Sequence, residues 1–130
     1  MFVIDSDKTI HITRGDIATI EIGTKDKSTG EDYVFKSGDV VRLNVHTKNK
    51  PADVVLLKDV KVQEGGTTVM DMFLDMEDTK IGDIIKRPKD YWYEIELNPD
   101  TAPQTIIGYD KETGAKIFRL YPEGGDKNEY

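Results

Sequence analysis

Residues 89–97 carry the pattern that constrains the fold most. At the period of two expected for a strand, one face carries Trp92, Glu94 and Glu96 and the other carries Tyr91, Tyr93, Ile95 and Leu97. The segment holds the only Trp of the chain and two of its six Tyr. Because large aromatic side chains bury more area than most others, we interpret this segment as the central strand of an all-β domain.

Shorter alternating segments predict further strands, separated by residues typical of turns, and no segment follows a helical period. The predicted strands cover residues 8–13, 17–22, 33–35, 40–46, 54–62, 67–76, 104–109 and 116–121, with a short helical turn near 78–83. About nine short strands at a spacing of about ten residues predict a β-sandwich or barrel. We further expect a hairpin or a switch of sheet at residues 14–16, a bulge at Lys58 and Asp59, and a closing hairpin around residues 110–114.

The length of 130 residues predicts one domain over residues 1–130, with a flexible end at 124–130 after Pro122. A chain of this size buries about two-thirds of its unfolded surface, so it needs no covalent staple. Cysteine is absent, which excludes disulfides and cysteine-ligated zinc. The N-terminus lacks a basic segment followed by an apolar run, so no signal peptide is predicted.

The charge argues against two classes of partner. The chain has 25 acidic and 18 basic residues, for a formal charge of −7. Nucleic acids and anionic membranes are bound by basic patches, whereas acidic residues are spread along this whole chain. We therefore expect neither nucleic acid nor a membrane as a partner.

Groups that could catalyse a reaction are few. His11 and His46 are the only histidines, and they lie on different predicted strands. Each alternates with apolar neighbours, which predicts solvated histidines on strand surfaces. Nucleophile-elbow, phosphate-loop, dinucleotide-binding and zinc-protease motifs are absent from the sequence. We expect no enzyme activity and no cofactor.

Two groups of carboxylates allow a second interpretation each. Glu94 and Glu96 project from one face of one strand, and two carboxylates about 5 to 9.5 Å apart can hydrolyse a glycoside. Alternating Glu residues on an outer face are more simply explained as solubilising residues. A denser acidic group has the oxygen ligands that calcium prefers but not the spacing of an EF-hand, so we predict no metal site. It consists of Asp71, Asp75, Glu77 and Asp78.

Two short patterns are interpreted as structural. Residues 14–16 spell Arg-Gly-Asp, the tripeptide that integrins bind, but Gly-Asp between two alternating segments is typical of a turn. Met70, Met72 and Met76 share one predicted strand face, and we place them in the core because methionine fills irregular gaps.

Trp92 is the main candidate for an interaction site. It shares the predicted outer face of its strand with Glu94 and Glu96, on a face that is otherwise polar. Three interpretations stay open: cover by a local loop, burial by another protein chain, and stacking on a sugar ring. Tryptophan is enriched among the anchor residues of protein interfaces.

The order of several segments resembles a known family. These segments are residues 13–16 (Thr-Arg-Gly-Asp), 33–35 (Tyr-Val-Phe), 38–43 (Gly-Asp-Val-Val-Arg-Leu), 78–79 (Asp-Thr), 91–97 (Tyr-Trp-Tyr-Glu-Ile-Glu-Leu) and 105–107 (Thr-Ile-Ile). In this order they resemble the N-terminal domains of phage upper baseplate proteins, which are tail-associated modules in phages and prophages of Gram-positive bacteria. The likeness runs from about residue 9 to residue 123.

The resemblance implies an immunoglobulin-like antiparallel β-sandwich without enzyme activity. It further implies a structural module of a phage or prophage tail or baseplate, made in the bacterial host cytoplasm and located in the virion. Other tail or baseplate proteins are the expected partners, together with further copies of the chain in a homo-oligomer. The alternative, drawn from the residues, is a small carbohydrate-binding β-sandwich in which Trp92 stacks on a sugar and nearby carboxylates bind its hydroxyls.

Overall fold

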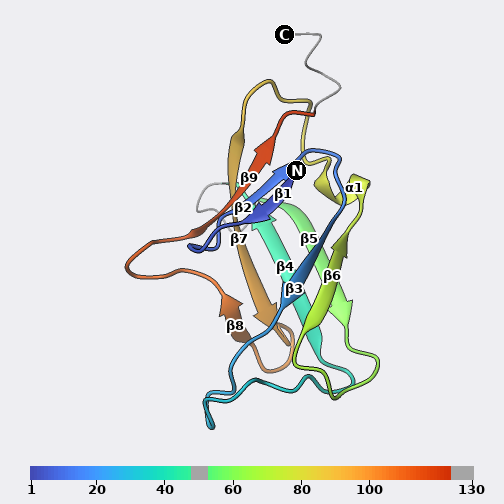
Figure 1. Ribbon diagram of the computed structural model, residues 1–130, viewed down its shortest axis with the longest axis vertical. Coiled ribbons are helices and arrows are strands. Elements are labelled where there is room, and N and C mark those ends of the chain that lie inside the picture. The colour runs from blue at the N-terminus through green and yellow to red at the C-terminus, as the bar shows by residue number, and fades with distance from the viewer. Residues whose placement is uncertain (48–52, 124–130) are drawn as a thin grey trace.

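The computed structural model describes residues 1–47 and 53–123, so the flexible end predicted at 124–130 lies outside the described residues. Within these ranges the chain forms nine strands and one short helix (Figure 1). They are β1 (Phe2–Ile4), β2 (Ile10–Thr13), β3 (Ala18–Ile22), β4 (Val40–His46), β5 (Val54–Lys61), β6 (Met70–Leu74), α1 (Met76–Thr79), β7 (Lys89–Leu97), β8 (Gln104–Ile107) and β9 (Lys116–Tyr121).

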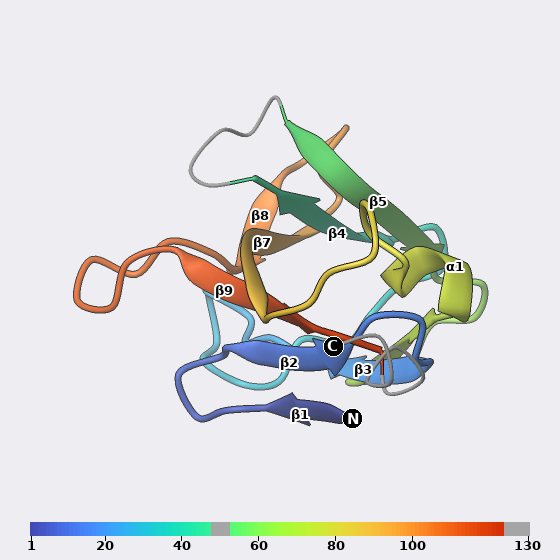
Figure 2. The ribbon, with the colours of Figure 1, turned by 90° about the horizontal axis from the view of Figure 1, so that it is seen from above.

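The strands form a sandwich of a large and a small sheet. The seven described strands of the large sheet follow the order β1-β2-β9-β7-β4-β5, with β8 also paired to β7, and the small sheet pairs β3 with β6. Figure 2 shows the large sheet curving from β1 and β2 round to β5, with β3 and α1 at its open side. The predicted all-β sandwich is confirmed.

One pair of strands differs from the predicted antiparallel arrangement. β2 and β9 run parallel, with Ile10 opposite Phe118, whereas the other pairs of named strands are antiparallel. Two strands that are joined by a short hairpin must run antiparallel. β2 and β9 come from opposite ends of the sequence, so no hairpin constrains their direction.

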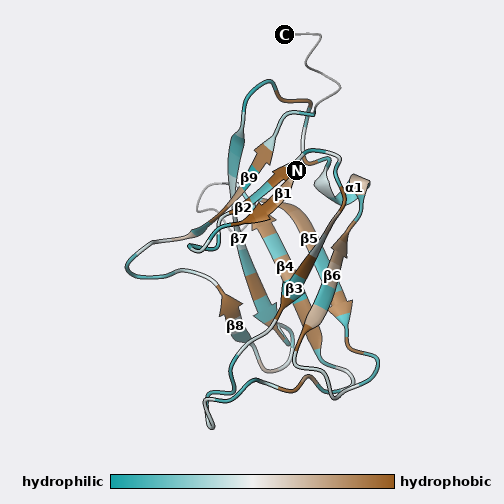
Figure 3. Ribbon diagram, in the orientation of Figure 1, coloured by the Kyte–Doolittle hydropathy of each residue, from teal (hydrophilic) through white to brown (hydrophobic). Residues whose placement is uncertain are grey.

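The alternation of residues 89–97 is confirmed. Strand β7 lies in the interior of the large sheet, because strands pair with both of its edges. Tyr91 and Tyr93 are each 2 % exposed, while Trp92 is half-buried on the outer face. Figure 3 shows hydrophobic and hydrophilic residues alternating along β4 and β7. The inward side chains of both sheets form one core, whose members include Ile12, Ile20, Leu43, Met72, Ile95 and Phe118.

The turn at residues 14–16 carries the chain from β2 in the large sheet to β3 in the small sheet. Gly15 has a φ of 86°, which favours glycine. The Arg14 side chain is 11 % exposed, and its guanidinium donates to the carbonyl oxygen of Gly82 at 2.7 Å and to Oε1 of Glu123 at 2.6 Å. The interpretation of this tripeptide as a turn is confirmed.

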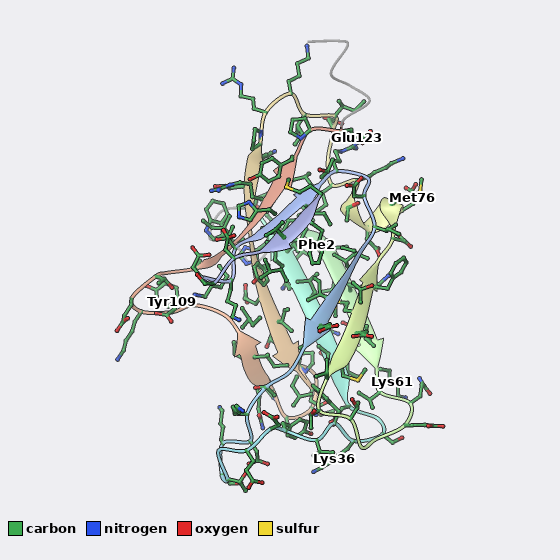
Figure 4. The ribbon with its side chains drawn as sticks, in the orientation of Figure 1. Phe2, Lys36, Lys61, Met76, Tyr109 and Glu123 are labelled. Atoms are coloured by element: carbon green, nitrogen blue, oxygen red, sulfur yellow. The ribbon has the colours of Figure 1, made fainter. Side chains whose placement is uncertain are left out.

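The connection from β6 to β7 begins with α1, slightly before the predicted helical turn. Asp75 caps the helix: Oδ1 of Asp75 accepts from the Asp78 N–H at 2.8 Å, and Oδ2 of Asp78 accepts from the Asp75 N–H at 3.0 Å. Met76 therefore begins a helix instead of continuing β6, and it is 51 % exposed. Figure 4 shows Met76 at the periphery of the molecule, on α1. The prediction that Met76 joins Met72 in the core is wrong for this reason.

The closing hairpin is interrupted. β8 pairs with residues 95–97 of β7, and β9 pairs with residues 89–93 of the same strand. β8 and β9 therefore lie one after the other along the same edge of β7. They do not pair with each other as the two strands of a hairpin. Residues 108–115 leave the sheet between them and project as a loop (Figure 1).

Two local predictions are wrong. Residues 33–35 form no strand, although Phe35 is fully buried. The register of β4 and β5 shifts between Val45 and His46, where Val55 is the extra residue, and pairing is regular at Lys58 and Asp59. The charged residues at 58 and 59 do not interrupt the strand, because both are neutralised by ion pairs. Lys58 forms an ion pair with Asp78, and Asp59 forms one with Arg42.

Candidate functional site

Trp92 lies on the outer face of the large sheet with neighbours on both sides. It pairs with His46 across β4 and β7, and with Ile117 across β7 and β9. Directly opposite residues in antiparallel strands have Cβ atoms about 4.5–5.5 Å apart. His46 and Ile117 therefore flank the indole, which stays half-buried.

Glu94 lies where β7 changes partners along one edge. Tyr93 pairs with Lys116 of β9, and Ile95 pairs with Ile107 of β8. The intervening loop bypasses Glu94, and an open pocket of about 480 Å³ lies at this position. The described residues that line it are His46, Trp92, Tyr93, Glu94, Thr105, Gly108, Tyr109, Ala115 and Lys116.

A close pair of side chains provides polar groups in this pocket. Nε2 of His46 lies 2.6 Å from Oε1 of Glu94. The His46 side chain is 5 % exposed and that of Glu94 is 34 % exposed, so the imidazole holds the carboxylate from its buried side. The prediction of a solvated histidine is wrong for His46, because Trp92 and Glu94 of the neighbouring strand pack beside it on the outer face.

His11 does not line this pocket, and β9 and β7 separate its strand β2 from β4, which carries His46. Its Nδ1 lies 2.7 Å from the Tyr121 hydroxyl oxygen, and its Nε2 lies 2.7 Å from Oδ2 of Asp5. The side chain is 15 % exposed, so the prediction of a solvated histidine is wrong here too. The structure does not bring the two histidines together.

Tyr109 is a further large aromatic residue of the pocket lining, besides Trp92 and the core residue Tyr93. It lies on the projecting loop (Figure 4) and is 77 % exposed. Cover of Trp92 by a local loop, one of the three interpretations of this residue, is therefore partial. The loop lies beside the indole and leaves an open space next to it.

Glu96 shares the outer face with Trp92 and Glu94 but lies further along β7. Its register neighbour on β4 is Arg42, which donates to Asp59 at 2.7 and 2.9 Å and to Asp100 at 3.0 and 3.2 Å. Of the three predicted site residues, the structure places Trp92 and Glu94 in the pocket lining and Glu96 outside it.

The acidic group considered for calcium takes part in local structure. Asp75 and Asp78 form the cap of α1, and Asp78 also accepts from Nζ of Lys58 at 2.8 Å. Burial alone would raise the pKa of Asp78, but hydrogen bonds from Lys58 and from the Asp75 N–H hold it below its usual value. Among residues 1–47 and 53–123, no group of three or more His, Asp or Glu side chains is arranged to hold a metal ion.

The sequence does not indicate His46, Tyr109 or Lys116 as residues of the site. The pocket is formed where β4, β8 and β9 meet β7, and these strands are far apart in the sequence or separated by a loop. His46 lies on β4, Lys116 lies on β9, and Tyr109 lies on the loop between β8 and β9. The one local signal is Tyr109 itself, a large aromatic residue next to a predicted turn.

Protein-family models, curated proteins and solved structures give no match to this chain. Within the described ranges, no helix is long and apolar enough to cross a membrane. The resemblance to baseplate domains therefore rests on the order of the sequence segments alone.

Proposed function

We propose that this domain is a non-enzymatic structural module of a phage or prophage tail or baseplate, and that it acts through protein–protein contacts. The role is taken from the resemblance, and two of its segments belong to the frame of the sandwich. Residues 14–16 join the two sheets, and residues 91–97 form most of β7. These two segments of the resemblance thus belong to the scaffold. Contacts with other proteins would use the faces and edges that the scaffold exposes.

The observation that carries the proposal is an apolar edge of the large sheet. β5 ends the order of the described strands, so one side of its backbone has no partner among them. Val54, Val55 and Leu57 on this strand are 43 %, 38 % and 52 % exposed. An exposed edge strand with apolar side chains favours pairing with another chain.

The apolar edge continues toward Trp92. Val54 pairs with His46 across β5 and β4, and His46 pairs with Trp92 across β4 and β7. We call this surface, formed by Val54, Leu57, His46 and Trp92, the β5–Trp92 face. A partner that pairs with β5 and also covers the outer face of β4 would contact the tryptophan, one of the residue types enriched among interface anchors.

Further copies of this chain and other tail or baseplate proteins are the partners that we propose. Homo-oligomers of soluble proteins are mostly closed and symmetric. An assembly module of this kind therefore forms a complex of fixed size, held by the same surface on every copy.

Sedimentation of two matched variants tests the surface. Leu57→Lys places a charge on the β5–Trp92 face, and Phe73→Lys places one on the outer face of the small sheet, where Phe73 is similarly exposed at 49 % against 52 % for Leu57. Both residues are exposed, so we expect the free energy of unfolding to change by less than about 0.5 kcal/mol.

We expect Leu57→Lys to shift the protein to smaller species and Phe73→Lys to sediment like the wild type. Dissociation by Phe73→Lys alone, or no difference between Leu57→Lys and an associated wild type, contradicts the use of the β5–Trp92 face.

A further inference from the structure

We propose that the pocket between Trp92 and Tyr109 binds a neutral saccharide. This inference goes beyond the assembly role, because it concerns a small ligand and not a protein. The pocket shares His46 and Trp92 with the β5–Trp92 face, and its other lining residues lie outside that face. The volume of about 480 Å³ lies within the range of about 300–1,000 Å³ found for small-molecule pockets.

Two aromatic side chains reach the pocket from different elements. Trp92 lies on β7, which has neighbours on both sides, and is held in place by them. Tyr109 lies on the projecting loop and is 77 % exposed. A sugar ring has a face of C–H groups that can cover an aromatic ring, with hydroxyls at its rim for polar partners. Two aromatic residues beside one open space suit such a ring, since each has an apolar body and a polar tip.

The polar groups of the pocket suit hydroxyl ligands. His46 holds one oxygen of the Glu94 carboxylate at 2.6 Å, and the 34 % exposure of Glu94 leaves acceptor capacity toward the pocket. Thr105 adds a hydroxyl that can donate and accept. Nζ of Lys116 donates to Oγ1 of Thr113 at 2.8 Å, which fixes the ammonium group at the base of the loop.

The charges favour a neutral ligand. Among the described lining residues, Lys116 is the only Lys or Arg and Glu94 is the only carboxylate. Phosphate and carboxylate ligands are bound tightly by arginine forks or clustered basic groups, which this lining does not supply. A single carboxylate also lacks the second acid that glycoside hydrolysis requires, so the pocket is suited to binding and not to cleavage.

The test uses Trp92 as its own reporter, because it is the only tryptophan of the chain. The full chain is titrated with a panel of neutral di- to tetrasaccharides of glucose, galactose, mannose, rhamnose and N-acetylglucosamine. Tryptophan emission and binding heat are recorded on the same samples. Tyr109→Ala removes one wall from an exposed loop, and Phe73→Ala is the control at an exposed aromatic residue of the opposite sheet.

We expect at least one oligosaccharide of the panel to shift the emission of Trp92 with saturation. Tyr109→Ala should weaken that binding about tenfold, as expected for the loss of an aromatic contact worth about 1.4 kcal/mol, and Phe73→Ala should leave it unchanged. Absence of both an emission change and binding heat across the panel overturns the proposal, and so does equal binding by Tyr109→Ala. Leu57→Lys separates the two proposals, because Leu57 belongs to the β5–Trp92 face and does not line the pocket. Light scattering on the same samples reports the loss of assembly, while sugar binding by Leu57→Lys should stay unchanged.

Discussion

Nε2 of His46 lies 2.6 Å from Oε1 of Glu94, so a buried imidazole of β4 holds a partly exposed carboxylate of β7 at the edge of the pocket. The two residues belong to strands that are far apart in the sequence and adjacent in the sheet. Their contact links the packing of the outer face to the geometry of the pocket, because a displaced Glu94 would leave His46 without this hydrogen bond.

Replacement of Glu94 by Ala should destabilise the domain by about 1–2 kcal/mol, because a buried polar group then loses a hydrogen-bond partner. Glu96→Ala is the matched control, since it removes the same group from the same strand and face. Its expected cost is below about 0.5 kcal/mol. Urea unfolding measures both values, and equal losses for the two variants would show that the contact with His46 contributes nothing.

Asp39 should control part of the acid stability. It is 8 % exposed; Oδ2 accepts from the Tyr33 hydroxyl at 2.7 Å and the Lys36 N–H at 2.9 Å, and Oδ1 accepts from Nδ2 of Asn98 at 3.0 Å. Burial alone would raise the pKa of this carboxyl, but the hydrogen bonds to it hold the pKa below its usual value. Asp39→Asn should therefore cost about 1–3 kcal/mol at neutral pH.

The sign of the pH dependence follows from the lowered pKa of Asp39. The ionised carboxylate stabilises the fold above the unfolded pKa of about 3.9, and this contribution is lost as the pH falls through the folded pKa. The stability difference between the wild type and Asp39→Asn should therefore shrink as the pH is lowered from neutral. Urea unfolding at several pH values measures it, with Asp83→Asn as an exposed control. A difference that stays constant with pH would refute the assignment.

Arg14→Lys should destabilise the domain even though the charge is kept. The guanidinium reaches Gly82 and Glu123 together, and a lysine ammonium cannot reproduce that planar fork. We expect a loss of about 1–3 kcal/mol, measured by chemical unfolding. Arg87→Lys, at an exposed position, should have no measurable effect. Wild-type stability of Arg14→Lys would mean that this clamp between the turn and the β6–β7 connection is dispensable.

The strands that the sequence predicts best are those whose two faces meet different surroundings. Residues 89–97 alternate because one face packs into the core and the other faces outward, so the period of two identifies both the strand and its buried residues. The same reasoning predicts Met76 wrongly as a buried strand residue, because the reciprocal cap between Asp75 and Asp78 ends β6 and begins a helix. A local competing signal of this kind was present in the sequence as Asp-x-x-Asp.

The pocket depended on information that no single segment contains. His46 is buried by residues of β7, which are close to it only in the assembled sheet. Tyr109 reaches the pocket because β8 and β9 divide one edge of β7 between them and leave a loop. The parallel pairing of β2 with β9 is a further contact between distant parts of the sequence that local patterns do not predict. Alternation identifies the face of a residue but not its neighbours on other strands.

The measurement that tests the central claim most directly is the mass of the protein in solution by size-exclusion chromatography with light scattering, over a dilution series. A structural module of a tail that assembles with copies of itself predicts one fixed oligomeric mass that persists on dilution, because closed symmetric contacts define the number of copies. A monomer at every concentration would contradict self-assembly through the β5–Trp92 face.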